Sequence, residues 1–173
     1  MIYYNWLYYN RHKPIEVIPT SYAWGRKVPI RMIDQPLSVW LQLKNIPIEP
    51  RTAIPVLRVF MGLRKWQVMT MRAGRVIALL NHVKAQVDRC NEIWKNIHGV
   101  LLEISDGLDR SHWSYLGDIN LIYELSQGDI LRSDAIEKKI TFAKAVNWKK
   151  IELAKIRDDQ NRYMKEKQKA KKT

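Results

Sequence analysis

The feature that most constrains this chain is an uninterrupted heptad pattern in its middle. Spacing that alternates between four and three residues puts every member on one side of an α-helix. It predicts one long helix over residues 76–104, about 43 Å long at about 1.5 Å per residue. Cys90 belongs to this seam, so we expect it to be a small buried residue and not a nucleophile. The seam consists of Val76, Leu80, Val83, Val87, Cys90, Trp94, Ile97, Leu101 and Ile104.

The prolines restrict long helices to the part of the chain that follows them. All seven lie at or before Pro55. Each removes a backbone donor and pushes the preceding residue towards extended geometry. We therefore expect residues 1–50 to form an extended arm, within which only Leu37–Lys44 could make a short helix.

The rest of the chain is predicted to form about four helices. The first runs from Thr52, a good N-cap, to about residue 73, and tolerates Pro55 in its first turn. After the helix over 76–104 come a shorter one over 113–125 and a last one from Ser133, where Asp134 and Glu137 have capping-box spacing. Short connections favour an antiparallel bundle. The predicted fold is all-α, with an extended Pro-rich arm at 1–50, a helical bundle at 51–165 and a basic tail at 166–173.

Net positive charge is concentrated in the first half of the chain. Residues 1–87 contain thirteen Lys and Arg residues against three acidic ones, whereas residues 88–173 contain seventeen against fourteen. Between Glu49 and Asp88 there is no acidic residue at all, while seven basic ones accumulate. A surplus of this size suits a polyanionic partner, and nucleic acid is the first to consider.

The candidate binding residues belong to the arm and to the predicted first helix. In that helix Arg58, Lys65 and Arg72 recur every seven residues and should project from one side. In the arm, aromatic residues that can pack against bases or sugars alternate with cations that can meet phosphates. The alternative is that the arm wraps its own helical domain and the cations face water. The candidates are Arg11, Lys13, Arg26, Lys27, Arg31, Lys44, Arg51, Arg58, Arg64, Lys65, Arg72 and Arg75.

No pattern indicates catalysis or a cofactor. No two of the four histidines have the i,i+4 spacing of a helical zinc pair, and a single cysteine excludes an intramolecular disulfide. Asp106 and Asp109 resemble the start of a calcium loop, but the later ligand positions carry no carboxylates. We expect no catalytic, metal-binding or cofactor-binding residues. The short apolar opening of the sequence is not expected to be a signal peptide, and no segment is expected to span a membrane.

The magnitude of the charge points to packaging. Thirteen net positive charges match about 22 Å of duplex DNA, which carries about one phosphate per 1.7 Å. Roughly one protein per half turn would therefore neutralise the polymer.

This layout resembles that of the major coat proteins of filamentous double-stranded DNA viruses of archaea. The shared features are the Pro-punctuated arm at 1–50, the basic residues Arg58, Lys65, Arg72 and Arg75, and the bundle at 76–165. The resemblance implies a structural virion protein whose N-terminal segment wraps the duplex and whose bundle forms the outside. It also implies paired coat subunits around A-like DNA, and a lipid envelope in some members.

Two other functions stay open. A ribosomal or organellar-ribosomal protein also combines a basic arm that threads rRNA with a helical domain on the surface. A helical adaptor would use the 76–104 seam to pair with another chain. The duplex could be DNA or RNA.

Overall fold

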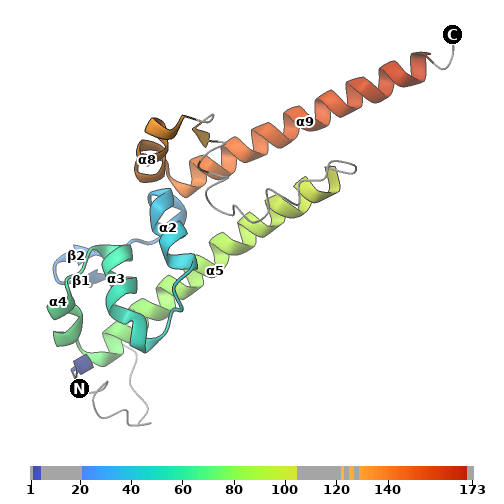
Figure 1. Ribbon diagram of the computed structural model, residues 1–173. Coiled ribbons are helices and arrows are strands. Elements are labelled where there is room, and N and C mark those ends of the chain that lie inside the picture. Colours follow the sequence, from blue (N-terminus) through green and yellow to red (C-terminus); the bar gives the residue numbers. More distant parts are fainter. Residues whose placement is uncertain (1, 5–20, 105–121, 123–124, 127–128, 171–173) are drawn as a thin grey trace.

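A computed structural model of the chain describes residues 2–4, 21–104, 122, 125–126 and 129–170. Over these residues the protein is mostly helical, with the helices packed together and one two-stranded hairpin (Figure 1), which confirms the all-α prediction. The predicted helix at 113–125 lies outside the described residues apart from 122 and 125. The elements are β1 (Tyr22–Ala23), β2 (Arg26–Lys27), η1 (Met32–Asp34), α2 (Leu37–Lys44), η2 (Pro50–Thr52), α3 (Ala53–Met61), α4 (Lys65–Thr70), α5 (Ala73–Ile104), α8 (Ile130–Lys139) and α9 (Phe142–Ala170).

Helix α5 confirms the long helix that the heptad seam predicts. It begins at Ala73, so Gly74 lies in its first turn and does not interrupt it. The seam is buried from Val76 to Cys90 and again at Ile97, and Trp94 is half-buried between them. Burial raises the pKa of the Cys90 thiol to about 11, so the thiol stays protonated at neutral pH. Other residues of the same chain bury the seam from Val76 to Ile97, so this part of α5 does not need a partner chain to cover it.

The prediction of one helix over residues 52–73 is wrong. Helix α3 ends at Met61, and Gly62 adopts the left-handed region at φ 68°. Its N–H donates to the Arg58 carbonyl at 2.8 Å, and helix α4 starts only at Lys65. Glycine is the usual residue for such a terminus because it has no Cβ to clash. The hydrophobic residues on both sides of Gly62 stay in the core, with α3 and α4 packed against each other.

Arg26 closes the end of α3 from outside the helix. Its Nη1 atom donates to the Met61 carbonyl at 2.8 Å and to the Gly62 carbonyl at 3.0 Å, which satisfies carbonyls that the helix itself leaves open. A Cβ at residue 62 would lie 2.6 Å from this Nη1. Gly62 is therefore constrained both by its positive φ and by the guanidinium beside it.

Gly62→Ala should consequently lower the free energy of unfolding by about 2 kcal/mol, since left-handed backbone costs about 1–2 kcal/mol for a residue with a Cβ and the Arg26 hydrogen bonds are also disturbed. Gly25→Ala is the matched control, because Gly25 has φ 73° but open space around it. It should cost about 1 kcal/mol less than Gly62→Ala. Denaturant unfolding measures both. Equal losses for the two variants would mean that the Arg26 contact contributes nothing.

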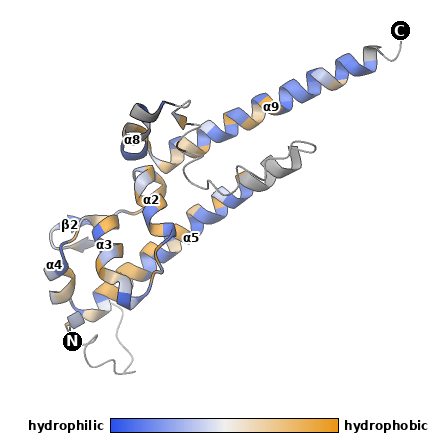
Figure 2. Cartoon of the chain, viewed as in Figure 1, coloured by the Kyte–Doolittle hydropathy of each residue, from blue (hydrophilic) through white to orange (hydrophobic). Residues whose placement is uncertain are grey.

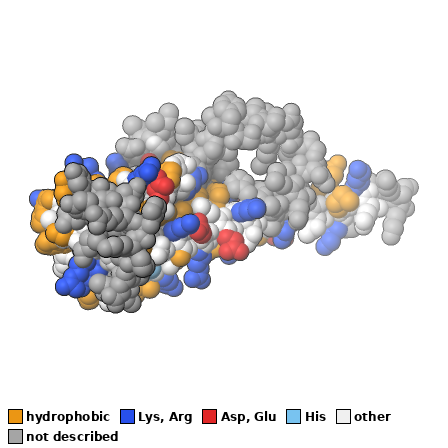
Figure 3. Space-filling model, turned by 90° about the horizontal axis from the view of Figure 1, so that it is seen from below, with side chains coloured by type: hydrophobic (Ala, Val, Ile, Leu, Met, Phe, Trp, Pro, Cys, Tyr) orange, Lys and Arg blue, Asp and Glu red, His pale blue; other side chains and the backbone are white. Residues whose placement is uncertain are grey.

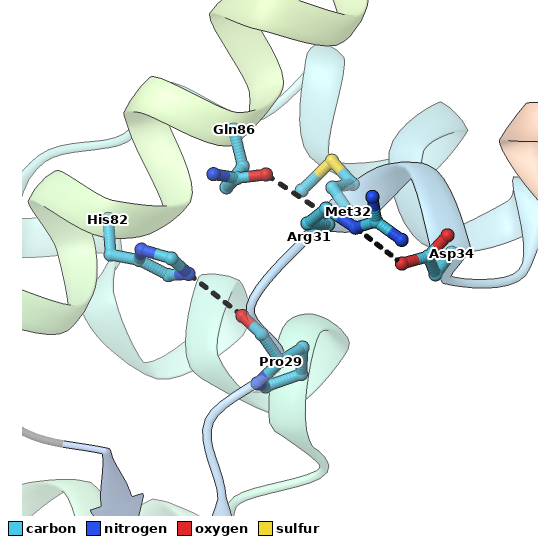
Figure 4. A network of polar contacts seen from close by, with 6 residues as sticks. All are labelled: Pro29, Arg31, Met32, Asp34, His82 and Gln86. Atoms are coloured by element: carbon cyan, nitrogen blue, oxygen red, sulfur yellow. Dashed lines mark hydrogen bonds and ion pairs between the residues drawn. The ribbon is translucent and has the colours of Figure 1, made fainter.

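The described part of the predicted arm lies against the bundle, as the alternative interpretation anticipated. Tyr3 is fully buried, its N–H donates to the Met71 carbonyl at 2.7 Å, and its hydroxyl donates to the Pro50 carbonyl. Burial raises the pKa of Tyr3 to about 12. Side chains of α5 fasten the chain at residues 29–32 (Figure 4): His82 Nε2 lies 2.8 Å from the Pro29 carbonyl, and Gln86 Oε1 accepts from the Met32 N–H at 3.1 Å.

Helix α2, the one helix expected in the arm, contributes Trp40 to the centre of the core. Trp40 is 1% exposed. Its ring meets that of Phe142 edge-on at 4.8 Å between centroids and lies 5.7 Å from that of Trp94. Its Nε1 donates to Asn91 Oδ1 at 3.0 Å. Trp40 thereby joins α2 to α5 and α9, so α2 belongs to the bundle.

The last predicted helix, from Ser133, is also divided and is longer than expected. Helix α8 begins at Ile130, so Asp134 lies inside it and not at its start. The chain then leaves the helical path at Thr141, which forms a bridge with Pro36. Leu37 N–H donates to the Ile140 carbonyl at 2.7 Å, and Phe142 N–H donates to the Gln35 carbonyl at 3.2 Å. Helix α9 continues to Ala170, through most of the predicted basic tail.

The two longest helices correspond to the second and fourth helices of the expected bundle, which run in the same direction when consecutive helices are antiparallel. In Figure 1, α5 and α9 rise in the same direction, and α9 extends beyond the body of the molecule. Residues 157–168 of α9 are all exposed, and this part of the helix is mostly hydrophilic (Figure 2). No helix in the described part of the chain has the length and apolar character needed to cross a membrane.

Candidate nucleic-acid interface

The cations of the acid-free stretch are gathered around the N-terminal end of α5. Helix α3 packs against both α4 and α5, and the hairpin lies beside them (Figure 1). Because these elements fold onto one another, the hairpin, α3, α4 and the first turns of α5 share one end of the molecule. The opposite end is formed by α9.

Three of the candidate residues already have protein partners. Arg26 caps α3 as described above. Arg31 forms an ion pair with Asp34, in which Nε lies 2.9 Å from Oδ2, and both side chains are more than half exposed. Lys44 places its Nζ 4.8 Å from the centroid of the Trp40 ring. These three residues are less available to bind an anion than the sequence indicates, although the exposed side of Arg31 still faces water.

Seven candidates have exposed side chains and no ion-pair partner among the residues that the structure describes. They come from β2, η2, α3, the start of α4, the connection to α5 and the first turn of α5. No acidic residue lies between residues 50 and 87, which contain six of the seven. The seven are Lys27, Arg51, Arg58, Arg64, Lys65, Arg72 and Arg75. Arg11 and Lys13 lie outside the described residues.

The heptad spacing of Arg58, Lys65 and Arg72 does not place them on one helix, because each belongs to a different segment: α3, α4 and the bridge to Ile2. The helical-face argument for these residues is therefore wrong, although all three are exposed. Figure 3, which views the molecule from below, shows Lys and Arg side chains scattered along the length of the visible side, with a few acidic side chains among them. The basic surface is made by several packed elements.

Sequence reasoning missed one pair of residues in this region. Trp66, in α4, is 52% exposed and lies against Trp24, at the tip of the hairpin, which is 46% exposed. Their ring centroids are 5.1 Å apart with the planes at 70°. From the sequence, Trp24 is one of the aromatic residues of the arm, and Trp66 has no predicted role. The sequence signal for Trp66 is its position directly after Arg64 and Lys65, within the stretch that has no acidic residue.

The described residues contain no cluster of three or more His, Cys, Asp or Glu side chains that could hold a metal ion. The described part of the chain therefore offers the basic surface and the Trp pair as its distinctive surface features. Comparison of the chain with protein-family models, with curated proteins and with solved structures finds no match in any of the three.

Proposed function

We propose that this protein is a structural, non-catalytic component that coats double-stranded nucleic acid, DNA in the first instance, through the phosphate backbone and without sequence preference. The observation that carries the proposal is the group of seven exposed cations that have no ion-pair partner among the described residues and lie in the elements around the N-terminal end of α5. Contacts to phosphates fix the position of a protein on a duplex but read no sequence. A surface rich in long basic side chains is suited to that kind of binding.

The projecting part of α9 supports a many-copy assembly. Its residues 157–168 are all exposed in the single chain, and the helix carries exposed apolar side chains at Ile151, Tyr163 and Met164. Isolated helices of this length are marginal in water, so packing against another subunit would stabilise it. We propose neighbouring coat subunits as that partner. This arrangement agrees with a major capsid protein of a filamentous virion, where one end of each subunit holds DNA and the other contacts its neighbours.

Mixing the purified protein with long random-sequence duplex DNA and viewing the product by negative-stain microscopy tests the proposal. Regular filaments with about one protein per half turn are expected from the charge balance. The same mixture with duplex RNA shows which polymer is preferred. Discrete particles, or no assembly with either duplex, would contradict a coat function, and a requirement for structured rRNA would favour the ribosomal alternative.

A further inference from the structure

We propose that Trp24 and Trp66 form a stacking site for one unpaired base, so that the protein holds single-stranded ends or gaps more tightly than continuous duplex. The proposal rests on the proposed function for the backbone contacts around this site, and it adds a preference for a form of nucleic acid. The two indoles come from segments 42 residues apart in sequence, and the fold brings them edge to face on the surface.

The exposure of these rings is the first observation. Large aromatic side chains usually bury most of their area, and indole N–H groups then need a partner. Here about half of each side chain stays in water, although Ala23 beside Trp24 in the hairpin and Val68 of α4 are buried. Because the planes cross at 70°, the edge of one ring meets the face of the other and ring surface remains open to a ligand. A nucleobase can stack on such a surface whatever its identity.

The backbone of Trp24 is the second observation. It has φ 51° and is followed by Gly25 at φ 73°, the combination of a tight hairpin turn in which Asn-Gly is preferred. A bulky residue with positive φ is an outlier, and such outliers cluster at functional sites. The position is held by Nε1, which donates to the Gln67 carbonyl of α4 at 2.8 Å. The turn therefore presents an indole in a fixed orientation beside Trp66.

The charge around the pair favours nucleic acid over an apolar protein partner. Arg64 and Lys65 directly precede Trp66, and Lys27 follows the turn. All three side chains are exposed and have no ion-pair partner among the described residues. Lys27 lies opposite Tyr22 in the hairpin, and Tyr22 is itself 58% exposed. Aromatic rings interleaved with cations, with no acidic residue between residues 50 and 87, are the arrangement of single-strand binding surfaces.

The test compares a short blunt DNA duplex with the same duplex carrying a short thymidine overhang, using fluorescence anisotropy of a labelled strand. For the natural chain we expect the overhang to tighten binding by at least about fivefold, since stacking of one base contributes that much or more. Trp66→Ala and Trp24→Asn should each remove this gain and leave binding to the blunt duplex unchanged. Asn keeps the positive φ that the turn requires.

Two further variants make the result specific. Trp66→Phe retains a ring face and should restore most of the gain. Tyr163→Ala removes an aromatic side chain that is 63% exposed on α9, at the other end of the molecule, and should have no effect. Circular dichroism of each variant confirms that the fold is intact.

The outcomes separate this inference from the proposed function. Blunt-duplex binding with no gain from the overhang, or a gain that survives Trp66→Ala, overturns the stacking site and leaves the coat function standing. Equal loss on blunt and overhang DNA in Trp66→Ala also overturns it, because the ring would then contact the duplex itself. Failure to bind blunt duplex, together with Trp66-dependent binding to the single strand, overturns the duplex function and supports the stacking site.

Discussion

Neutralising Arg58, Lys65, Arg72 and Arg75 together, each to Gln, is expected to reduce the salt dependence of duplex binding sharply. Each phosphate contact contributes about 0.9 to the slope of log affinity against log salt concentration, so loss of four contacts should reduce the slope by about 3.6. The four side chains are exposed and have no protein partner among the described residues, so the fold should be unaffected. Binding to a short blunt duplex of random sequence, titrated over a range of salt, measures the slope.

A matched variant separates this surface from net charge. Lys155, Arg162, Lys165 and Lys167 are exposed residues of α9, at the opposite end of the molecule (Figure 1), and their change to Gln removes the same charge. We expect this variant to keep the slope of the natural chain on a duplex that holds a single protein. An unchanged slope for the first variant, or equal losses for both, would contradict the proposed interface.

Trp40→Ala is expected to destabilise the protein by about 3–5 kcal/mol, the range for removal of a buried large aromatic side chain. The ring is 1% exposed and contacts both Phe142 of α9 and Trp94 of α5. Its removal leaves a cavity where three helices meet and also deletes the hydrogen bond to Asn91. Denaturant unfolding followed by circular dichroism measures the loss.

Two other variants serve as controls for the stability loss of Trp40→Ala. Trp40→Phe keeps most of the ring contact but not the hydrogen bond, so it should cost less than Trp40→Ala. Trp66→Ala removes the same side chain at a position that is 52% exposed and should cost much less. A loss below about 1 kcal/mol for Trp40→Ala would show that α2 is not part of the core.

Local patterns predicted much of the helical content. The alternation of four- and three-residue spacing was sufficient for α5 because an apolar stripe can be buried only if the backbone is helical there. Helix α2 was predicted by the proline-free interval between Pro36 and Pro47, with the same bounds that the structure has. The break at Gly62 was also readable in principle, since a glycine followed by a non-helical segment is a common helix end. The seven-residue spacing of Arg58, Lys65 and Arg72 points the other way, because it favours one continuous helix.

The break between α8 and α9 had no such signal. Neither glycine nor proline lies near Thr141, and the sequence there has helical periodicity. The chain leaves the helix because the backbone groups of Ile140 and Phe142 bond to Leu37 and Gln35, about a hundred residues earlier. A long-range backbone contact of this kind leaves no local trace in the sequence.

The sequence by itself determined the helical class, the long central helix and the placement of positive charge before residue 88, because these depend on residue type and on spacing within one segment. Tertiary structure alone decided which cations remain available and which aromatic residues meet. Arg26 is used to cap α3, and Trp40 is enclosed in the core, whereas Trp66 stays on the surface beside Trp24. The physical reason is that burial, capping and ring contact are set by residues distant in sequence.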